Sequence, residues 1–266
     1  MEKKTTSMSN IKIIFFDIDG TLIDMDKKHI SKKTLETLIR LKENNIMICL
    51  STGRSPLALP QFDGIEADVY LTFNGSYCYD RKHTIFSNPI PNEDVKRIVE
   101  NASSLNRPVL IATKDRMAAN GKDGDLVEYT AFANLPVIVS DDFEKTANTE
   151  EIYQVMMGCR KEDYPAIMKN VHNARITAWW DRAVDIIPAN GGKGAGVRRV
   201  LEYYRLDPSE ALAFGDGGND MEMFEAVGIG VAMGNASPQL KAIADSVCGS
   251  AADDGIYYYC AENGLI

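Results

Sequence analysis

The sequence predicts an α/β protein with a parallel sheet and an inserted α+β domain. Short apolar runs at residues 11–16, 46–50 and 68–73 each end in polar or glycine-containing sequence, and a helical pattern separates the first two. This order is typical of a parallel sheet whose site lies at the carboxyl ends of the strands. The same pattern returns after residue 193, and the sequence between the two parts has a different character.

The first apolar run, IKIIFF, predicts a strand buried on both faces, because it is short, rich in Ile and Phe, and followed by the polar DIDGT. Ser31 is a suitable N-cap for the next helix, in which Leu35, Leu38 and Ile39 fall at helical spacing. Asn44 and the residue after it are expected to end that helix. The runs IMICL and DVYLTF then supply the second and third strands.

The last part of the chain repeats the alternation of helix and strand. A helix with one apolar stripe is expected at residues 193–205, and the strand ALAF follows at 211–214. The segment IGVAM at 229–233 predicts a further strand. Ser237 and Pro238 suit the N-cap and the first turn of another helix.

The middle of the chain predicts a domain of its own. It combines short or alternating β-like segments with helical patterns at residues 92–105 and 161–171. About a hundred residues are enough for an independent α+β domain. We therefore expect a core formed by residues 1–87 and 188–266 and an inserted domain at residues 88–187. The strands expected in the inserted domain are residues 108–113, 152–158, 175–180 and 183–187.

The composition excludes several classes of protein. Hydrophobic residues make up 45% and charged residues 25% of the 266 residues, as in globular proteins, which argues against disorder. The net charge of -9 would repel nucleic acid and anionic membranes. The longest weakly polar run covers about half of the roughly 20 residues that a membrane helix needs, and the N-terminal sequence is not a signal peptide. Five cysteines without a CxxC pair predict reduced thiols in a cytoplasmic protein.

Acidic residues follow two of the expected strands. Asp17 and Asp19 lie two apart in FFDIDGT, where Gly20 allows a sharp turn that directs both carboxylates to one point. Such a pair can hold Mg²⁺, which prefers oxygen ligands. The alternative is a solvated Asp-Gly turn. Asp216 in GDGGND reaches the same edge of a parallel sheet and would supply a third carboxylate.

GDGGND has two other interpretations, a helix cap and a dinucleotide-binding loop. Asn219 or Asp220 could cap the helix that follows. A dinucleotide-binding loop is disfavoured, because Asp220 stands where the third glycine of GxGxxG belongs.

Groups suited to binding phosphate follow other expected strands. In STGR, the Thr52 hydroxyl and the Gly53 amide can donate to a phosphate oxygen. Lys193 in GGKGAG opens a helix, so an ammonium group and free helix amides converge there. Taken alone, Lys193 would more often be a surface lysine. The motif is not a P-loop, because Gly194 follows the lysine where Ser or Thr belongs.

The ordered motifs DxDGT, STGR, GGKGxG and GDGGND resemble those of the haloacid dehalogenase superfamily, in particular its Cof-like phosphatases with a type IIB cap. The resemblance covers nearly the whole chain, and it includes FNGSY, MGNA at residues 233–236 and the late ADDG. It implies a Rossmann-like core, an inserted α+β cap, and Mg²⁺-dependent hydrolysis of a small phosphorylated metabolite.

The resemblance also implies a role for each motif residue. Asp17 would be the nucleophile that forms an aspartyl-phosphate, and Asp19 would be the general acid and base. Mg²⁺ would lie between the Asp17 carboxylate, the Asp19 main-chain carbonyl and Asp216. The phosphoryl oxygens would be held by Thr52, Gly53, Lys193 and Asn219, and Asp220 would orient Lys193 or a metal-bound water.

Substrate choice is expected in the cap, which in this superfamily closes over the site. Trp179 and Trp180 offer an aromatic face for a sugar, and Arg182 offers a cation for a second anion. Each tryptophan could instead belong to the core of the cap. Arg54 and Asn74 are the candidates outside the cap. A sugar phosphate or a similar phosphomonoester is the expected substrate.

The second aspartate of DxDGT separates branches of the superfamily. P-type ATPases carry Thr at the position of Asp19, and dehalogenases lack this aspartate, so the resemblance implies phosphate-ester chemistry. Two alternatives to a hydrolase stay open: a phosphomutase of the same fold, and a catalytically silent protein that binds a phosphorylated ligand. The sequence leaves the oligomeric state unknown.

Overall fold

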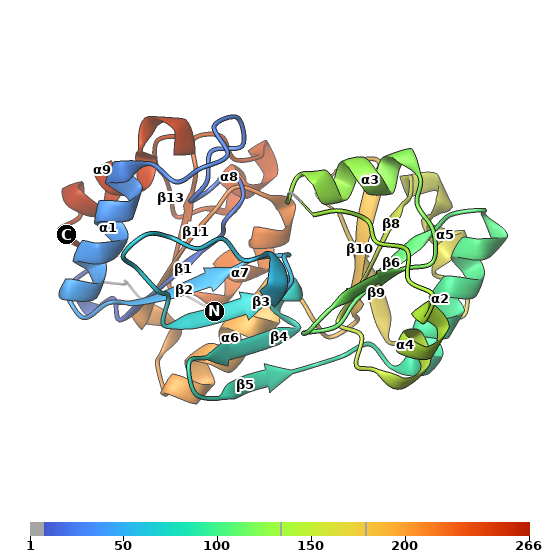
Figure 1. Ribbon diagram of the computed structural model, residues 1–266. Coiled ribbons are helices and arrows are strands. Elements are labelled where there is room, and N and C mark those ends of the chain that lie inside the picture. The colour runs from blue at the N-terminus through green and yellow to red at the C-terminus, as the bar shows by residue number, and fades with distance from the viewer. Residues whose placement is uncertain (1–7, 134, 179) are drawn as a thin grey trace. The chain divides into compact units, whose positions relative to one another are not determined.

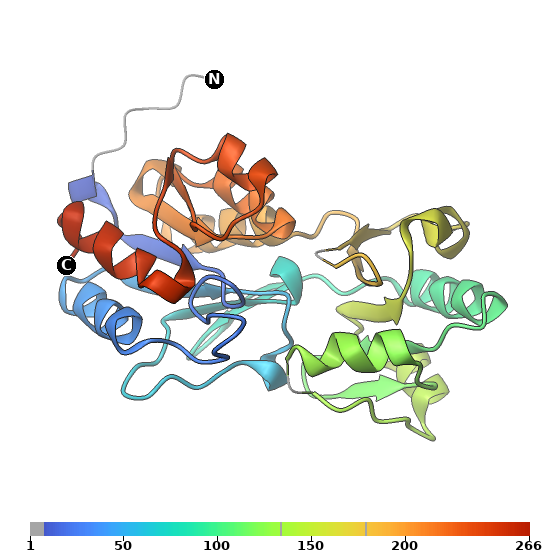
Figure 2. The same cartoon turned by 90° about the horizontal axis from the view of Figure 1, so that it is seen from above.

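The computed structural model describes residues 8–133, 135–178 and 180–266, which form two compact units (Figures 1 and 2). The first unit contains the chain up to Thr52, together with Pro60–Phe86 and Lys193–Ile266. The second unit contains Gly53–Leu59 and Ser87–Gly192. Each unit has its own sheet.

The sheet of the first unit is mostly parallel. Within the described residues it has eight strands, and its hydrogen-bonded pairs are parallel from one edge as far as the pair of β2 (Met47–Ser51) and β3 (Val69–Thr72). Beyond β3 the pairing becomes antiparallel. The complete order is β13 (Ser246–Val247), β12 (Ile229–Ala232), β11 (Ala211–Gly215), β1 (Ile13–Phe16), β2, β3, β4 (Tyr77–Asp80) and β5 (Thr84–Ser87).

The central strands β1 and β11 bring two distant parts of the sequence together. Every residue of both strands is buried, as expected for a strand covered on both faces. They pair in parallel with Phe16 opposite Phe214, and the two rings stack with centroids 5.3 Å apart. The residues that follow these two strands therefore emerge at the same edge of the sheet.

Capped helices cover this sheet. In α1 (Lys32–Glu43) the Ser31 hydroxyl accepts a hydrogen bond from the Thr34 amide, and the helix ends at Asn44, as predicted. In α8 (Pro238–Ile243) Ser237 caps in the same way. Figure 2 shows α1 (blue) beside α9 (Gly255–Glu262, red). The remaining helices are α6 (Lys193–Tyr204) and α7 (Met221–Ala226), which pack together, and the short 3₁₀ turns are Met8–Asn10, Phe73–Gly75, Pro208–Glu210, Gly218–Asp220 and Ala251–Asp253.

The second unit is an antiparallel sheet with helices on both faces (Figure 1). Its described strands run in the order β7 (Met117–Ala119), β6 (Val109–Ala112), β8 (Gln154–Gly158), β10 (Ala183–Pro188) and β9 (Ala174–Thr177), and each neighbouring pair is antiparallel. One face packs on α2 (Asn92–Ser104), α4 (Phe143–Thr149) and α5 (Tyr164–Ile167) in a shared hydrophobic core, and α3 (Gly124–Ala131) contacts β8 and β10.

The prediction of an α/β core sheet with a separate α+β domain is confirmed, but three details of the prediction are wrong. The core sheet is not entirely parallel, because the hairpin β4–β5 adds two strands beyond β3. The helix predicted at 161–171 is a 3₁₀ turn, Lys161–Asp163, followed by the short α5, and Asn170 then turns left-handed (φ 59°). The strand predicted at 175–180 already ends at Thr177.

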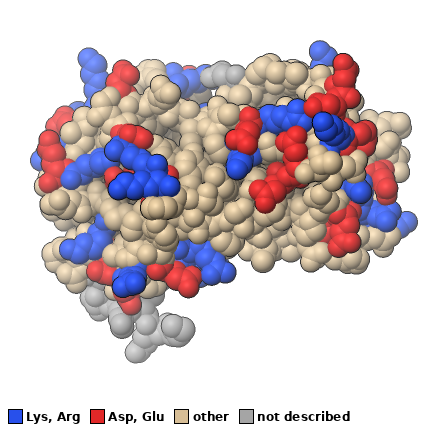
Figure 3. Space-filling view, turned by 60° about the horizontal axis from the view of Figure 1, so that its bottom comes forward, with Lys and Arg blue, Asp and Glu red and all other residues tan. Residues whose placement is uncertain are grey.

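The charged groups do not form one continuous basic area on the face drawn in Figure 3, where Lys and Arg lie interspersed with Asp and Glu. This distribution agrees with the net charge of -9. None of the helices in the described part of the chain has the length and apolar character of a membrane span. The five cysteines, all within the described residues, are free thiols.

The close packing of α6 leads to a stability prediction. A methyl group on Gly196 would lie 2.7 Å from the Leu71 side chain and 2.9 Å from the Gly75 Cα. We expect Gly196→Ala to lower the free energy of unfolding by about 1–3 kcal/mol, because this much overlap forces neighbouring atoms apart. Urea-induced unfolding measures the change.

A second helical glycine provides the matched control. Gly124, at the start of α3, has no heavy atom within 4 Å of an added methyl group. Gly124→Ala should be neutral or should stabilise by up to about 1 kcal/mol, because alanine restricts the unfolded chain. Equal stabilities of the Gly124→Ala and Gly196→Ala variants would contradict the packing account.

Candidate active site

Two aspartates emerge at the carboxyl edge of the core sheet, directly after β1 and β11. The Asp17 amide continues the strand pairing by donating to the Phe214 carbonyl over 3.0 Å. Asp216 is the first residue after β11. Between them, Gly20 has a positive φ of 87°, and a side chain there would collide with the Asp216 carboxylate. The glycine of DIDGT therefore permits the close approach of the two motifs.

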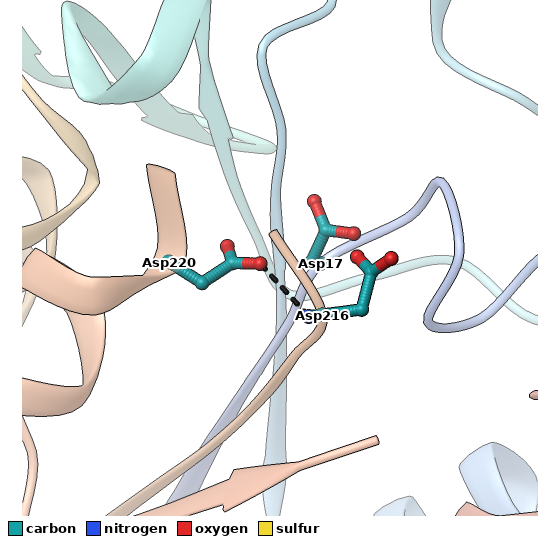
Figure 4. Close-up of side chains that lie close together, drawn as sticks. All are labelled: Asp17, Asp216 and Asp220. Carbon is teal, nitrogen blue, oxygen red and sulfur yellow. Dashed lines mark hydrogen bonds between the residues drawn. The ribbon is translucent and has the colours of Figure 1, made fainter. Parts of the chain in front are cut away.

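A third aspartate joins this pair. Carboxylate oxygens of Asp17, Asp216 and Asp220 lie within 4.8 Å of one another (Figure 4). The Asp220 Oδ2 atom accepts hydrogen bonds of 3.0 Å from the backbone amides of Asp216 and Gly217. Asp220 thus closes the start of the turn Gly218–Asp220 from within. Its side chain makes no capping bond to α7, so the interpretation of Asp220 as the cap of the helix that follows is wrong.

Lys193, the first residue of α6, lies between two of these carboxylates. Its Nζ atom donates to Asp17 Oδ1 and to Asp220 Oδ1, each over 2.6 Å. The lysine is 1% exposed, so the surface-lysine alternative is wrong. Burial alone would lower the pKa of Lys193, but the two carboxylates raise it above its ordinary value, and the side chain stays an ammonium.

The carboxylates outnumber the nearby positive charge. Burial raises the pKa of Asp17 well above its usual range, against the opposing effect of Lys193, and the charges of Asp220, Asp216 and Asp19 raise it further. Burial, with the charge of Asp220, raises the pKa of Asp216 to about 7. Ionised carboxylates this close together are stable only with additional positive charge.

The residues present fit a divalent cation. Both oxygens of Asp220 already accept hydrogen bonds, whereas the contacts of Asp216 are long: Thr21 donates over 3.5 Å and Asn235 over 3.4 Å. Asp17 and Asp216 are therefore the better candidates for metal ligands in this cluster. Their oxygens are the ligand type that Mg²⁺ prefers.

Asn235 was not among the residues singled out from the sequence. Its Nδ2 atom donates to the Gly20 carbonyl over 2.8 Å, and its Oδ1 atom accepts from the Ala251 amide over 3.0 Å. It thereby ties the turn after β1 to Ala251, the residue directly before the late ADDG segment. The signal was the MGNA motif directly after β12, where a polar residue follows another strand of the same sheet.

The predicted phosphate ligands Thr52 and Asn219 both lie near the turn Phe73–Gly75. Thr52 is 1% exposed, and its carbonyl accepts from the Asn74 amide over 2.9 Å. Asn219 donates from Nδ2 to the Asn74 Oδ1 atom over 3.1 Å. Asn74 is itself buried, so the structure joins it to a predicted phosphate ligand.

The remaining candidates belong to the second unit. Gly53 and Arg54 fall in its segment Gly53–Leu59, where the Arg54 guanidinium donates to the Ala58 carbonyl over 2.9 Å. Trp179 lies outside the described residues.

Trp180 and Arg182 form a stack within the second unit. Trp180 is half-buried and parallel to the Tyr129 ring at 6.1 Å, and Phe132 meets it edge-on at 5.4 Å. Arg182 lies 4.2 Å from the centre of the Trp180 ring and forms an ion pair with Glu128. Much of the Trp180 ring and of the Arg182 guanidinium is therefore already in contact with other side chains of this unit.

Comparisons with known proteins agree with the geometry. The haloacid dehalogenase-like hydrolase family matches residues 14–260. The Bacillus subtilis protein YkrA, provisionally named a phosphatase, is 33% identical over 256 residues, which cover 96% of this chain and 98% of that one. The 5-amino-6-(5-phospho-D-ribitylamino)uracil phosphatase YitU of Bacillus subtilis is 31% identical, with 94% and 96% covered.

A solved structure leads to the same family. The structure of a haloacid dehalogenase subclass IIB sugar phosphatase superposes with a TM-score of 0.86 at 28% identity, covering 96% of this chain and all of that one. Its subclass agrees with a mostly parallel core sheet and a separate antiparallel sheet. The chain therefore belongs to the haloacid dehalogenase-like hydrolase family, and within it to the Cof-like phosphatases of subclass IIB.

Proposed function

We propose that this phosphatase is a Mg²⁺-dependent phosphomonoester hydrolase in which Asp17 is transiently phosphorylated. The observation that carries the proposal is the buried Asp17 carboxylate, held 2.6 Å from the Lys193 ammonium and close to Asp216 at the end of β1. A carboxylate in a fixed orientation, with charge compensation beside it, is suited to nucleophilic attack on phosphorus.

In the first step, an Asp17 carboxylate oxygen forms a bond to phosphorus, and the bond from phosphorus to the ester oxygen breaks. Asp19 donates its proton to the departing oxygen, so the product is a neutral alcohol. Asp19 lies two residues from Asp17, after the turn of the DIDGT motif, and is partly exposed, as expected for a group that exchanges protons with substrate and water.

In the second step, Asp19 removes a proton from water, and the water oxygen forms a bond to phosphorus. The bond between phosphorus and Asp17 breaks, which releases inorganic phosphate and restores the carboxylate. The proton taken from water returns Asp19 to the state that began the cycle. The overall change is hydrolysis of one phosphate ester.

We assign the phosphoryl oxygens to donors from three segments of the chain. The Lys193 ammonium and the Thr52 hydroxyl are two of these donors. Asp220 holds Lys193 in place through the 2.6 Å contact. Asp17, Asp216 and the Asp19 main-chain carbonyl would hold Mg²⁺, which supplies positive charge that offsets repulsion between carboxylate and phosphate. The full set of proposed phosphate ligands is Thr52, Gly53, Lys193 and Asn219.

The proposed substrates are sugar phosphates or similarly small phosphomonoesters. Relatives of this chain include proteins named as a sugar phosphatase, a phosphoribitylaminouracil phosphatase and, in Escherichia coli, a pyridoxal phosphate phosphatase. Their variety indicates that the site at Asp17 sets the reaction and that another region sets the leaving group. We propose that the inserted unit, acting as a cap, is this region. The five free thiols suit a reducing compartment, and we assign the protein to the cytoplasm.

The roles of the two aspartates can be tested separately. Asp17→Asn should abolish turnover, because the amide is a poor nucleophile. Asp19→Asn should lower kcat by roughly 10²–10⁴-fold, the usual contribution of a general acid and base. Release of inorganic phosphate from a panel of phosphorylated sugars, nucleotides and pyridoxal phosphate measures both. Asp26→Asn, an exposed aspartate in the same loop, is the control and should leave turnover unchanged.

Two results would contradict this assignment. Wild-type turnover in Asp17→Asn would remove Asp17 as the nucleophile. Conversion of a hexose phosphate to its isomer without release of phosphate would identify a mutase in place of a hydrolase.

The proposed metal site predicts changes in thermal stability that can be measured without an activity assay. The pKa of Asp216 is raised to about 7, so its ionised form costs stability; the penalty grows above pH 4 and is complete above pH 7. At pH 8 and in EDTA, Asp216→Asn should therefore melt at a higher temperature than the parent chain. Saturating Mg²⁺, at about 100 times its Kd, should stabilise the parent by about 2.7 kcal/mol and the variant far less.

Thermal unfolding with EDTA or with Mg²⁺ provides both comparisons. Asp26→Asn should keep the full response to Mg²⁺. The metal assignment would be contradicted if Mg²⁺ left the melting temperature of the parent chain unchanged and turnover persisted in EDTA.

A further inference from the structure

The turn Phe73–Gly75, which joins β3 to β4, has an unusual backbone. Phe73 (φ 50°), Asn74 (φ 51°) and Gly75 (φ 85°) are all left-handed. Asn and Gly tolerate this region, but a bulky residue such as Phe rarely adopts it. Phe73 is fully buried, so its packing holds the turn in a strained form. Strain of this kind persists only where the surroundings impose it, and it is concentrated at functional sites.

The turn touches three segments that carry proposed phosphate ligands. The Asn74 amide donates to the Thr52 carbonyl over 2.9 Å. The Asn74 Oδ1 atom accepts from the Asn219 Nδ2 atom over 3.1 Å. Gly75 packs against the first turn of α6, where a methyl group on Gly196 would lie 2.9 Å from the Gly75 Cα. A single turn therefore sets the relative positions of these three segments.

Asn74 is too deeply buried for a residue that would contact a leaving group. It is 2% exposed, and its carboxamide lies against Asn219. An amide nitrogen carries two hydrogens. The bond to Asn74 uses one of those on Asn219 and fixes the direction of the other, so the orientation of the donor is set before an anion arrives. Such preorganisation reduces the entropy that binding costs.

We propose that Asn74 is a positioning residue, which orients the Asn219 amide toward the phosphoryl group, and that the strained turn keeps Asn74 in place. Asn74 then acts on phosphate affinity through Asn219 and not by touching the substrate. The inference rests on the proposed function, because it takes Asn219 to be a phosphate ligand.

Glycine at position 74 removes the carboxamide and keeps the left-handed backbone at no steric cost. Asn74→Gly should raise the Ki of inorganic phosphate, measured as a competitive inhibitor of p-nitrophenyl phosphate hydrolysis, by about 3- to 10-fold, as the loss of one hydrogen bond predicts. Asn45→Gly is the matched control: Asn45 is also left-handed (φ 58°) but lies at the end of α1, and its Ki should equal that of the parent. An unchanged Ki in Asn74→Gly would overturn the proposal.

The double variant Asn74→Gly with Asn219→Ala shows whether Asn74 acts through Asn219. Its Ki should equal that of Asn219→Ala alone, whereas two effects that multiply would overturn the proposal. A lower melting temperature in Asn74→Gly with normal phosphate inhibition would reduce Asn74 to a structural role and would also overturn it. If inorganic phosphate inhibits Asn219→Ala with the Ki of the parent chain, the inference about Asn74 is wrong, but the proposed role of Asp17 is unaffected. If the parent chain releases no phosphate from any ester, the proposed function itself fails.

Discussion

The structure of the site depends on the Lys193 ammonium between the Asp17 and Asp220 carboxylates. All three groups are buried, and buried charges are tolerated only when they are paired and hydrogen-bonded. The pairing requires the end of β1, the start of α6 and the turn Gly218–Asp220 to meet at one point. Removing one member of such a group leaves an uncompensated charge, which typically costs about 3–5 kcal/mol. The residues proposed for catalysis therefore also hold separate segments of the core together.

The local charge balance explains how an acidic protein can handle an anionic substrate. The chain carries a net charge of -9, and three of its aspartates, Asp17, Asp216 and Asp220, lie together at the edge of the core sheet around the Lys193 ammonium. A divalent cation there would balance the two negative charges that one ammonium leaves on three carboxylates, while the chain as a whole stays acidic. Phosphate affinity in such a site depends on the bound cation and a few fixed donors, and it responds little to surface lysines and arginines.

Short-range patterns predicted the parts of the fold that local sequence determines. Buried runs that end in DIDGT and GDGGND located β1 and β11, and Ser31 and Ser237 were identified as caps because a cap bonds to an amide three residues away. The hairpin β4–β5 was missed because YCYD and TIFS are only four residues each and are separated by the basic segment RKH. Contacts between distant positions gave no local signal: Asn219 bonds to Asn74 across 145 positions, and Asn235 bonds to the Gly20 carbonyl across 215.

The stack around Trp180 gives the second unit an intrinsic optical reporter. Both tryptophans of the chain, at positions 179 and 180, fall within the segment Ser87–Gly192, and the first unit contains tyrosines and phenylalanines but no tryptophan in its sequence. Trp180 contacts Tyr129, Phe132 and the Arg182 guanidinium, so its emission is sensitive to the packing of this unit. Fluorescence excited selectively at tryptophan therefore follows the inserted unit alone, and the Mg²⁺-dependent stability proposed for Asp17 and Asp216 follows the core, which contains both residues. Unfolding of the two units can thus be distinguished in the unlabelled wild-type chain.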